Sequence, residues 1–394
     1  MNTSYCGAEA RRIITQLVAW SFQALSAGVY PSCDPYGQQF STSYMPDRYK
    51  LAGQRLAGDY RFVLDAVQAD QDYARQLFSL ERFFSRTECC AYCKAAQHGG
   101  GGQNSEMLYT NFSPTAPHRN TNISSCDEWI ATHGKTPLLS VPGFWPHARV
   151  LPDWMHIVDL AIAPDLIGSL ILDITDSKTV YNGSSRDIRL TLAFTGYRDW
   201  CNANHVQDRC MARMFSRAVL LPGLVYPHIS QKTMSGTASR FVIQWLAGVM
   251  RQVASADASE EQKTRAGTVC ALADMANVMA CNGWVMSDAD ARRFQFAALA
   301  FQCGYMKMAV SALGKRQLRW KIRPKWHQLI CHLVPMVPLN GRYFMNYLDE
   351  DYVRRTKHLA SRCTPSGMSS EVCQRFSLQA CMRWAELYAG GLTL

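Results

Sequence analysis

An aspartate and a histidine three residues apart, Asp153 and His156, open a mostly apolar segment over residues 151–174. Side chains at this spacing share one face of a helix, so the pair could hold a metal ion or carry out acid–base chemistry. The same spacing fits a structural role, in which Asp153 caps a helix N-terminus and His156 is a hydrogen-bonded core histidine. Spacing alone leaves both interpretations open.

A group of cysteines stands at Cys89, Cys90 and Cys93. The Cys-x-x-Cys spacing of Cys90 and Cys93 allows both thiolates to bind one tetrahedral zinc ion. His98 stands where a zinc knuckle has its third ligand, but Gln103 replaces the last cysteine of the knuckle, so a fourth ligand would come from elsewhere. The candidates for that ligand are Cys126, His118, His133 and His156. The alternative is a group of reduced, partly buried cysteines that holds no metal.

The segment KRQLRWKIRPK, residues 315–325, is rich in basic side chains and contains Trp320. Its basic residues are Lys315, Arg316, Arg319, Lys321, Arg323 and Lys325. Clustered Lys and Arg contact phosphates, and an aromatic ring can stack on a base or sugar, so the pattern predicts nucleic-acid binding. A solvated connector between helices would have the same composition. KWHQLICH overlaps this segment and adds His327 and His332.

An acidic triplet, residues 349–351, lies one helical turn before Arg354 and Arg355. Ion pairs between residues three or four apart on a helix would explain this pattern. A two-metal nuclease, however, also needs carboxylates that hold Mg²⁺ between the attacking and leaving oxygens. Glu350, on a helix, could supply one of them.

Composition narrows the class of protein. The 394 residues are enough for two or three domains, and 48% hydrophobic residues indicate a globular chain. Fifteen cysteines, an odd number at irregular spacings, favour a reduced interior over a disulfide framework. The polar N-terminus lacks the apolar core of a signal peptide, and no uncharged apolar run reaches about 18 residues. We therefore expect a nuclear or cytoplasmic protein, neither secreted nor bound to membranes, whose net charge of +10 suits a polyanionic partner such as nucleic acid.

Hydrophobic periodicity predicts a mainly helical protein with a small mixed sheet before residue 150. A helix is expected at residues 8–27, a strand at 59–67 and a helix at 70–84. Pro164 predicts a kink or two helices, with the proline in the first turn of the second. Further helices are expected at residues 234–255, 259–282, 287–313, 324–334, 343–361 and 369–389.

The order of these motifs resembles that of CACTA-type eukaryotic DNA transposases, a family with relatives abundant in dinoflagellate genomes. The similar pieces are RFFSRTECCAYCKA, PDWMHIVDLAIAPDLIGSLILDI, RPKWHQLICHL and NGRYFMNYLDEDYVRR. They form short islands over residues 15–385, and DWMHI and CAYC are the most specific of them.

This resemblance implies a ribonuclease H-like core with three carboxylates, helical insertions and a helical C-terminal region. It assigns Asp70 to the second acid and Glu350 to the last. Asp153 and His156 match the DWMH-type motif, which favours a role in a site for this pair. The ancestral reaction would be metal-dependent phosphodiester hydrolysis and strand transfer on DNA. Mg²⁺ would be needed only for catalysis, whereas zinc would be structural.

The family's first acid should lie on a strand upstream of Asp70, but Asp34 and Asp47 stand there in turn-like sequence next to prolines. We therefore expect an N-terminally truncated, degenerate transposase that binds DNA; an assembly of several copies stays open. The alternative is a non-catalytic helical module that binds nucleic acid or protein. Convergence of Asp70, Asp153 and Glu350 within metal-bridging range would distinguish the two.

The resemblance and the patterns together divide the chain into four parts. The expected parts are a partial ribonuclease H-like segment with the Cys-x-x-Cys motif (1–98), a flexible Gly- and Pro-rich loop (99–150), a DWMH-type helical segment (151–230) and a helical C-terminal region with the basic cluster (231–394).

Overall fold

The computed structural model of the protein describes residues 7–97, 105–178, 180–221, 225–227, 229–255, 257–364 and 367–389. The chain divides into two compact units. The larger is Glu9–Met345, and the smaller joins Asn346–Leu394 to Met1–Ala8.

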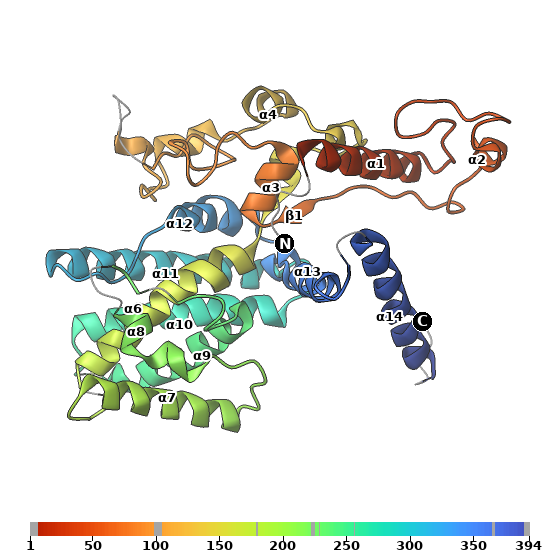
Figure 1. The fold of residues 1–394 in the computed structure, drawn as a ribbon. Helices are drawn as coiled ribbons and strands as arrows, with labels where there is room; N and C mark the ends of the chain where they lie inside the picture. The colour runs from red at the N-terminus through yellow and green to blue at the C-terminus, as the bar shows by residue number, and fades with distance from the viewer. Residues whose placement is uncertain are drawn as a thin grey trace. The chain divides into compact units, whose positions relative to one another are not determined.

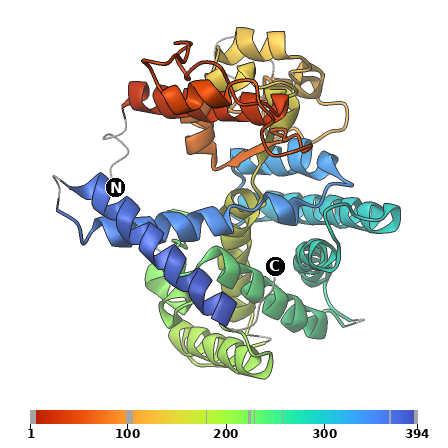
Figure 2. The same cartoon turned by 90° about the vertical axis from the view of Figure 1, so that its right-hand side faces the viewer.

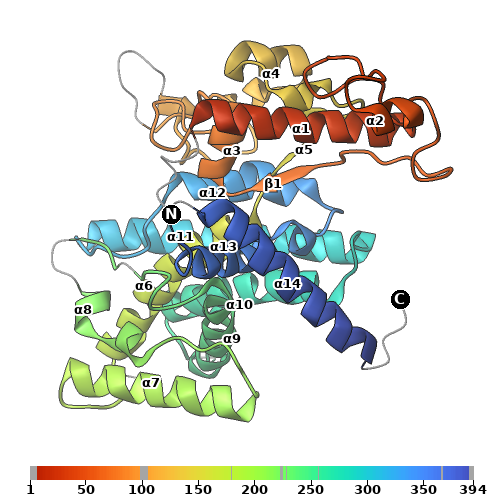
Figure 3. The same ribbon diagram turned by 45° about the vertical axis from the view of Figure 1, so that its right-hand side comes forward.

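Short elements make up the first part of the larger unit (Figure 1). They are α1 (Ala8–Ala27), α2 (Pro46–Leu51), β1 (Val67–Ala69), α3 (Gln71–Phe78), η2 (Ser105–Met107), η3 (Pro117–Thr121), α4 (Cys126–His133), η4 (Pro137–Ser140), α5 (Pro146–Arg149) and β2 (Val150–Pro152). A small core lies between α1, α3 and α4, and Figure 3 shows these three helices close to one another. At its centre the buried ring of Trp129 meets Phe78 edge-on, 6.2 Å between ring centroids.

The two strands pair in parallel, with Val67 opposite Val150 and Ala69 opposite Pro152. The small sheet predicted before residue 150 is thus two-stranded and parallel among the described residues, not mixed, and its second strand ends at Pro152. The strand predicted at 59–67 begins only at Val67. The residues that suggested it, such as Tyr60 and Val63, lie exposed without a ladder partner among the described residues, because β propensity alone does not supply a neighbouring strand.

Helices dominate the rest of this unit. They are the π-helix η5 (Met155–Ile162), α6 (Ala163–Asp176), α7 (Arg186–Ala203), η6 (Ala212–Phe215), α8 (Arg217–Leu220), α9 (Gly236–Val253), α10 (Glu260–Cys281), α11 (Asp288–Gly314), α12 (Pro324–Gln328), the π-helix η7 (Leu329–Leu333), η8 (Val334–Met336) and η9 (Gly341–Phe344). The side chains of Ser235, Ser259 and Ser287 cap α9, α10 and α11 by accepting backbone N–H bonds. The mainly helical fold class is confirmed.

Helix α6 is buried on nearly all sides and packs against α7, α8 and α9 (Figure 2). Its Leu166, Ile167 and Leu170 are fully buried. Pro164 lies in the first turn of α6, as predicted, but the backbone stays helical across the junction with η5, where the turn changes from π to α. The proline ring cannot continue an uninterrupted α-helix because it lacks an N–H and clashes with the preceding turn.

The structure corrects two of the expected boundaries. In place of a flexible loop over residues 99–150, the described residues from 105 to 150 form short helices around the buried Trp129. One continuous core runs from Phe112 to Leu333, so a boundary at residue 230 would divide it. The composition of the segment was misleading, because Gly- and Pro-rich sequence that connects short helices resembles the sequence of a loop.

The smaller unit contains α13 (Tyr347–Ala360) and α14 (Met368–Ala389), which pack on each other through Tyr352 and Phe376. Asp351 forms ion pairs with Arg354 and Arg355 on α13, as the alternative interpretation of the acidic triplet predicted.

One described helix, α11, is long and apolar enough to cross a membrane by length and composition. It also contributes Phe294, Phe301 and Tyr305 to the core of the larger unit. Because the core helix of a water-soluble protein meets the same criteria, one such helix is weak support for a membrane span.

Candidate metal centre

Two histidines face one point because of an unusual helical turn. His327 lies in α12 and His332 in the π-helix η7 that continues it. On a regular α-helix, side chains five residues apart point about 140° away from each other. The wider i→i+5 turn of a π-helix reduces this angle. As a result, the two Nε2 atoms lie 3.2 Å apart.

The loop after α3 brings two cysteines to the same point. The backbone bridge between Glu88 and Ala96 closes the loop, and the N–H of Tyr92 donates to Sγ of Cys90 at 3.4 Å. This is the arrangement in which a Cys-x-x-Cys pair presents both sulfurs on one side. Cys90 and Cys93 are fully buried.

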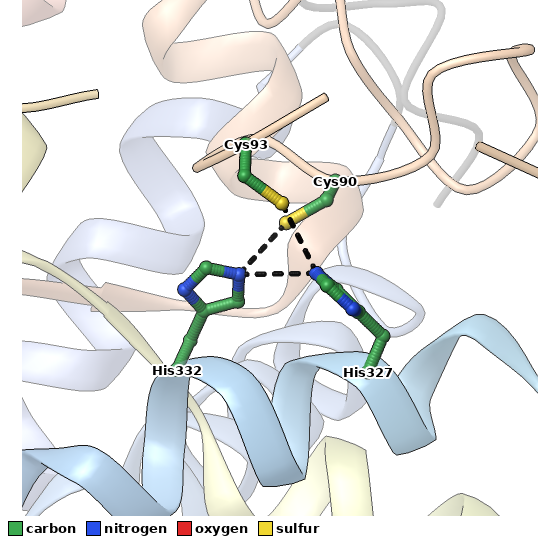
Figure 4. A group of neighbouring side chains, drawn as sticks. All are labelled: Cys90, Cys93, His327 and His332. Carbon is green, nitrogen blue, oxygen red and sulfur yellow. Dashed lines mark hydrogen bonds between the residues drawn. The ribbon is translucent and has the colours of Figure 1, made fainter. Parts of the chain in front are cut away.

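The four side chains form a compact cluster (Figure 4). Sγ of Cys90 lies 3.2 Å from Nε2 of His332, and Sγ of Cys93 lies 3.2 Å from Nε2 of His327. A tetrahedral ion with ordinary metal–nitrogen and metal–sulfur bonds would place its ligand atoms about 3.3–3.8 Å apart. All four ligand atoms lie within 4.8 Å of one another, so this buried cluster could hold a metal ion. His332 borders a cavity of about 260 Å³.

Local electrostatics distinguish the sulfur of Cys90 from that of its neighbour Cys89. Burial opposes ionisation of Cys90, but hydrogen bonds from Cys93 and the Tyr92 N–H, with the charge of Arg82, lower its pKa below the ordinary value. Burial, together with the charges of Cys90 and Cys93, raises the pKa of Cys89 to about 12. Cys89 therefore stays a thiol and donates to the carbonyl of Ala95 at 3.4 Å. Thiolates are the metal-binding form of cysteine, so Cys90 is prepared for a metal and Cys89 is not.

Two of the predicted metal ligands, Cys90 and Cys93, lie in the cluster, whereas His98 falls outside the described residues. The four candidates for the remaining ligand have other partners. These are Asn111 for His118, Ala91 and Glu81 for His133, His147 for Cys126 and Asp153 for His156. Sequence patterns alone do not assign His327 and His332 to the metal. A His-x-x-x-x-His pair matching the Cys-x-x-Cys pair was the available signal.

The parallel register places Asp70 and Asp153 next to each other, each directly after its strand. Each carboxylate caps a helix: Asp70 accepts from the N–H of Tyr73 at 2.6 Å, and Asp153 accepts from that of Met155 at 2.9 Å. The other oxygen of Asp153 forms a short hydrogen bond with Nδ1 of His156. Asp153 therefore caps a helix with one oxygen and orients His156 with the other.

Lys325, two residues before the metal-cluster histidine His327, reaches the same strand edge. Its Nζ donates to the carbonyl of His156 at 2.9 Å. Burial lowers the pKa of Lys325 to about 8, against the opposing charges of Asp153 and Asp70. A cavity of about 30 Å³ lies beside these groups, which is space for about one water molecule. The side chain of Glu350 is outside the described residues, and its helix belongs to the smaller unit.

The predicted nucleic-acid-binding segment is largely occupied by internal contacts. Arg319 pairs with Asp173 and Asp176 at 3.2 and 3.0 Å. Arg323 binds Asp165 through two hydrogen bonds, one of 2.7 Å, and the side chain of Asp165 is only 3% exposed. These two arginines act as internal ion-pair partners.

The other basic residues of the segment differ in exposure. Lys315 forms a short ion pair with Glu261, and Lys321 lies over the ring of Tyr226, 5.7 Å from its centroid. Arg316 is exposed. Trp320, expected to stack on nucleic acid, is buried, and its backbone N–H donates to Ser169 Oγ at 2.8 Å.

Comparisons with protein-family models, with curated proteins and with solved structures give no match.

Proposed function

We propose that this chain is a transposase-derived DNA-binding protein with a partial ribonuclease H-like core, whose ancestral reaction was metal-dependent phosphodiester hydrolysis and strand transfer. The observation that carries the proposal is the position of Asp70 and Asp153 at the ends of adjacent parallel strands. Ligands of open α/β folds bind at this edge of a sheet. Two neighbouring carboxylates there are what a metal-dependent phosphoryl-transfer site requires.

The surroundings of the pair favour a degenerate site. Asp153 uses one oxygen for a backbone N–H and the other for His156. The ammonium group of Lys325 lies within electrostatic range of both carboxylates. A Mg²⁺ ion would have to compete with this internal cation, so the pair is proposed to stabilise the strand edge in place of catalysis.

We propose that the ion of the Cys90, Cys93, His327 and His332 cluster is zinc. Two thiolates and two imidazoles are the ligand set of structural zinc sites, and three of the four side chains are buried here. The ion would connect a loop of the N-terminal part to α12 and η7, more than two hundred residues later in the chain. Free thiols bind it best in a reducing compartment, such as the nucleus, where DNA is available, or the cytoplasm.

DNA contact is proposed for the helical part of the larger unit. Residues 151–345 contain 22 Lys and Arg against 14 Asp and Glu, which accounts for most of the positive balance of the chain. Within the segment 315–325, Arg316 and Lys321 form no ion pair with an acidic side chain in the described structure and lie near the surface. They are the candidates for phosphate contacts.

The test is the salt dependence of binding to duplex DNA. Each phosphate contact contributes about 0.9 to the slope of log K against log salt. The Arg316→Gln, Lys321→Gln double variant should therefore flatten the slope by up to about 2 units. Arg213→Gln, Lys232→Gln removes the same charge from two exposed residues elsewhere and should change the slope less. Equal slopes for the wild type and the first variant would contradict the assignment.

The engagement of Arg319 and Arg323 by internal acids favours a second candidate, a helical module that binds a protein partner. Weak DNA binding with little salt dependence in the wild-type chain would support this alternative.

A further inference from the structure

A second cluster of side chains that could bind a metal ion adjoins the first and shares one residue with it. It consists of His118 in η3, His327 in α12 and Cys331 in η7. One ligand atom from each lies within 4.8 Å of the other two. All three side chains are buried, with exposures of 0%, 1% and 7%. His327 belongs to both clusters.

The hydrogen bonds identify the nitrogens that face this second cluster. Nε2 of His118 lies 2.8 Å from the carbonyl of Asn111, an acceptor, so Nε2 carries the proton and Nδ1 has a lone pair. Nε2 of His327 faces Cys93 and His332 in the first cluster. The remaining atoms, Nδ1 of His118 and Nδ1 of His327, are buried and have no hydrogen-bond partner in the described structure.

Two such nitrogens next to each other need an explanation. The rings of His118 and His327 lie edge to face, 4.7 Å between centroids at an interplanar angle of 80°. Buried polar atoms are nearly always satisfied, and an exception points to an unseen ion or water. A thiol, Cys331, completes the group, which makes a metal ion the better candidate because a thiolate binds it more strongly than water binds a thiol.

We propose that Nδ1 of His118, Nδ1 of His327 and Sγ of Cys331 form a second metal site for a soft monovalent ion of the copper(I) class. Thiolate and imidazole ligands select copper(I). Zinc sites usually have four ligands, and the described residues supply only three here. The Cys331 thiolate balances the single positive charge of copper(I), and loss of the Nδ1 proton of His327 leaves one negative charge that the two metal ions share.

The ring of His327 then bridges the two centres. Binding forms one copper–sulfur and two copper–nitrogen bonds, and it breaks the S–H bond of Cys331 and the Nδ1–H bond of His327. Two protons leave to solvent, and no electron is transferred. A zinc ion on Nε2 of His327 makes the Nδ1 proton more acidic. The bridge rests on the zinc centre proposed above, whereas the three-ligand site does not.

Copper(I) titration of the zinc-loaded full-length chain, under nitrogen and against a chromophoric copper(I) chelator, tests the proposal. We expect one tightly bound copper(I) per chain with zinc retained, and release of two protons per copper. His118→Phe keeps a ring of similar size, and Cys331→Ser keeps the volume of the thiol. Either change should weaken copper binding by about a hundredfold or more, because even the loss of an outer partner of a ligand can cost that much.

Cys126→Ser is the matched control, since Cys126 lies beside His147 outside both clusters. This variant should bind copper like the wild type. Copper that displaces zinc from the first centre, or affinity unchanged in both His118→Phe and Cys331→Ser, would overturn the second site. Copper binding that depends on His118 and Cys331 in a chain that takes up no zinc would uphold this site and remove only the zinc proposal and the bridge.

Discussion

His133 is satisfied in only one protonation state. Its Nδ1 accepts from the N–H of Glu81 at 3.2 Å, and its Nε2 pairs with the carbonyl of Ala91 at 2.8 Å. A second proton would point Nδ1–H at another N–H. Burial, with the charge of Arg82 and against the Ala91 hydrogen bond, accordingly lowers the pKa of His133 in the folded protein.

This lowered pKa makes the free energy of unfolding depend on pH. The unfolded chain binds the proton more readily, so stability is full above the ordinary pKa of about 6.5 and is lost as pH falls through the lower folded value. Urea unfolding between pH 5 and 8 should show this decline, and His133→Gln should reduce it. His205→Gln, at an exposed position, should retain the decline. A pH profile unaffected by His133→Gln would disprove this role.

Arg323 and Arg316 are neighbours in one basic segment with different roles. Removing the charge of Arg323 leaves the carboxylate of Asp165, which is 3% exposed, without its bidentate partner. Breaking a buried pair typically costs about 3–5 kcal/mol. We expect Arg323→Gln to lower the free energy of unfolding by about that amount and Arg316→Gln, on the surface, to change it by less than about 0.5 kcal/mol. Similar stabilities for the two variants in chemical denaturation would refute the distinction.

At the scale of elements, the metal cluster joins a loop to a helix. Cys90→Ser, Cys93→Ser should remove the bound metal and lower the melting temperature, because metal binding to a folded site stabilises the folded state. Cys89→Ser is the control, since the thiol of Cys89 bonds a carbonyl and is not a ligand. Metal analysis by mass spectrometry and thermal unfolding provide the measurements. Equal metal content in the double variant and the wild type would remove the assignment.

The helices of the larger unit could be predicted closely because the sequence of each helix by itself indicates where the helix begins and ends. Expected helices at 259–282 and 287–313 match α10 and α11 to within a residue or two, since apolar spacing and the capping serines Ser259 and Ser287 mark their limits. The sheet could not be predicted in the same way. A three-residue strand has too few positions to show an alternating pattern, and its partner lies 83 residues later in the chain.

The candidate metal site likewise contains residues that the sequence could identify and residues that only the fold brings together. Cys90 and Cys93 could be identified from their spacing, which by itself brings two sulfurs together. His327 and His332 could not be paired with them, because five residues on a regular α-helix place the side chains on different faces and only the π-turn of η7 aligns them. Proximity of Asp70 to Asp153 likewise depends on parallel pairing of distant strands.

At the scale of the whole molecule, the question is whether the chain cuts DNA. Two-metal phosphoryl transfer requires carboxylates that hold both ions about 4 Å apart. Of the three expected acids, Asp70 and Asp153 lie together, but both cap helices and both lie near the ammonium group of Lys325. We therefore expect no nicking of supercoiled plasmid above background with Mg²⁺ or Mn²⁺.

Lys325→Met provides the informative comparison. It removes the internal cation while keeping a long apolar side chain, so the carboxylates become available to an external ion. We expect this variant to bind Mn²⁺ more tightly than the wild type, which titration calorimetry or paramagnetic broadening can measure. Asp70→Asn added to Lys325→Met should abolish the gain. If the wild-type chain nicks DNA in a metal-dependent manner and Asp70→Asn removes that activity, the carboxylates already hold catalytic ions beside Lys325 and the degenerate interpretation is wrong.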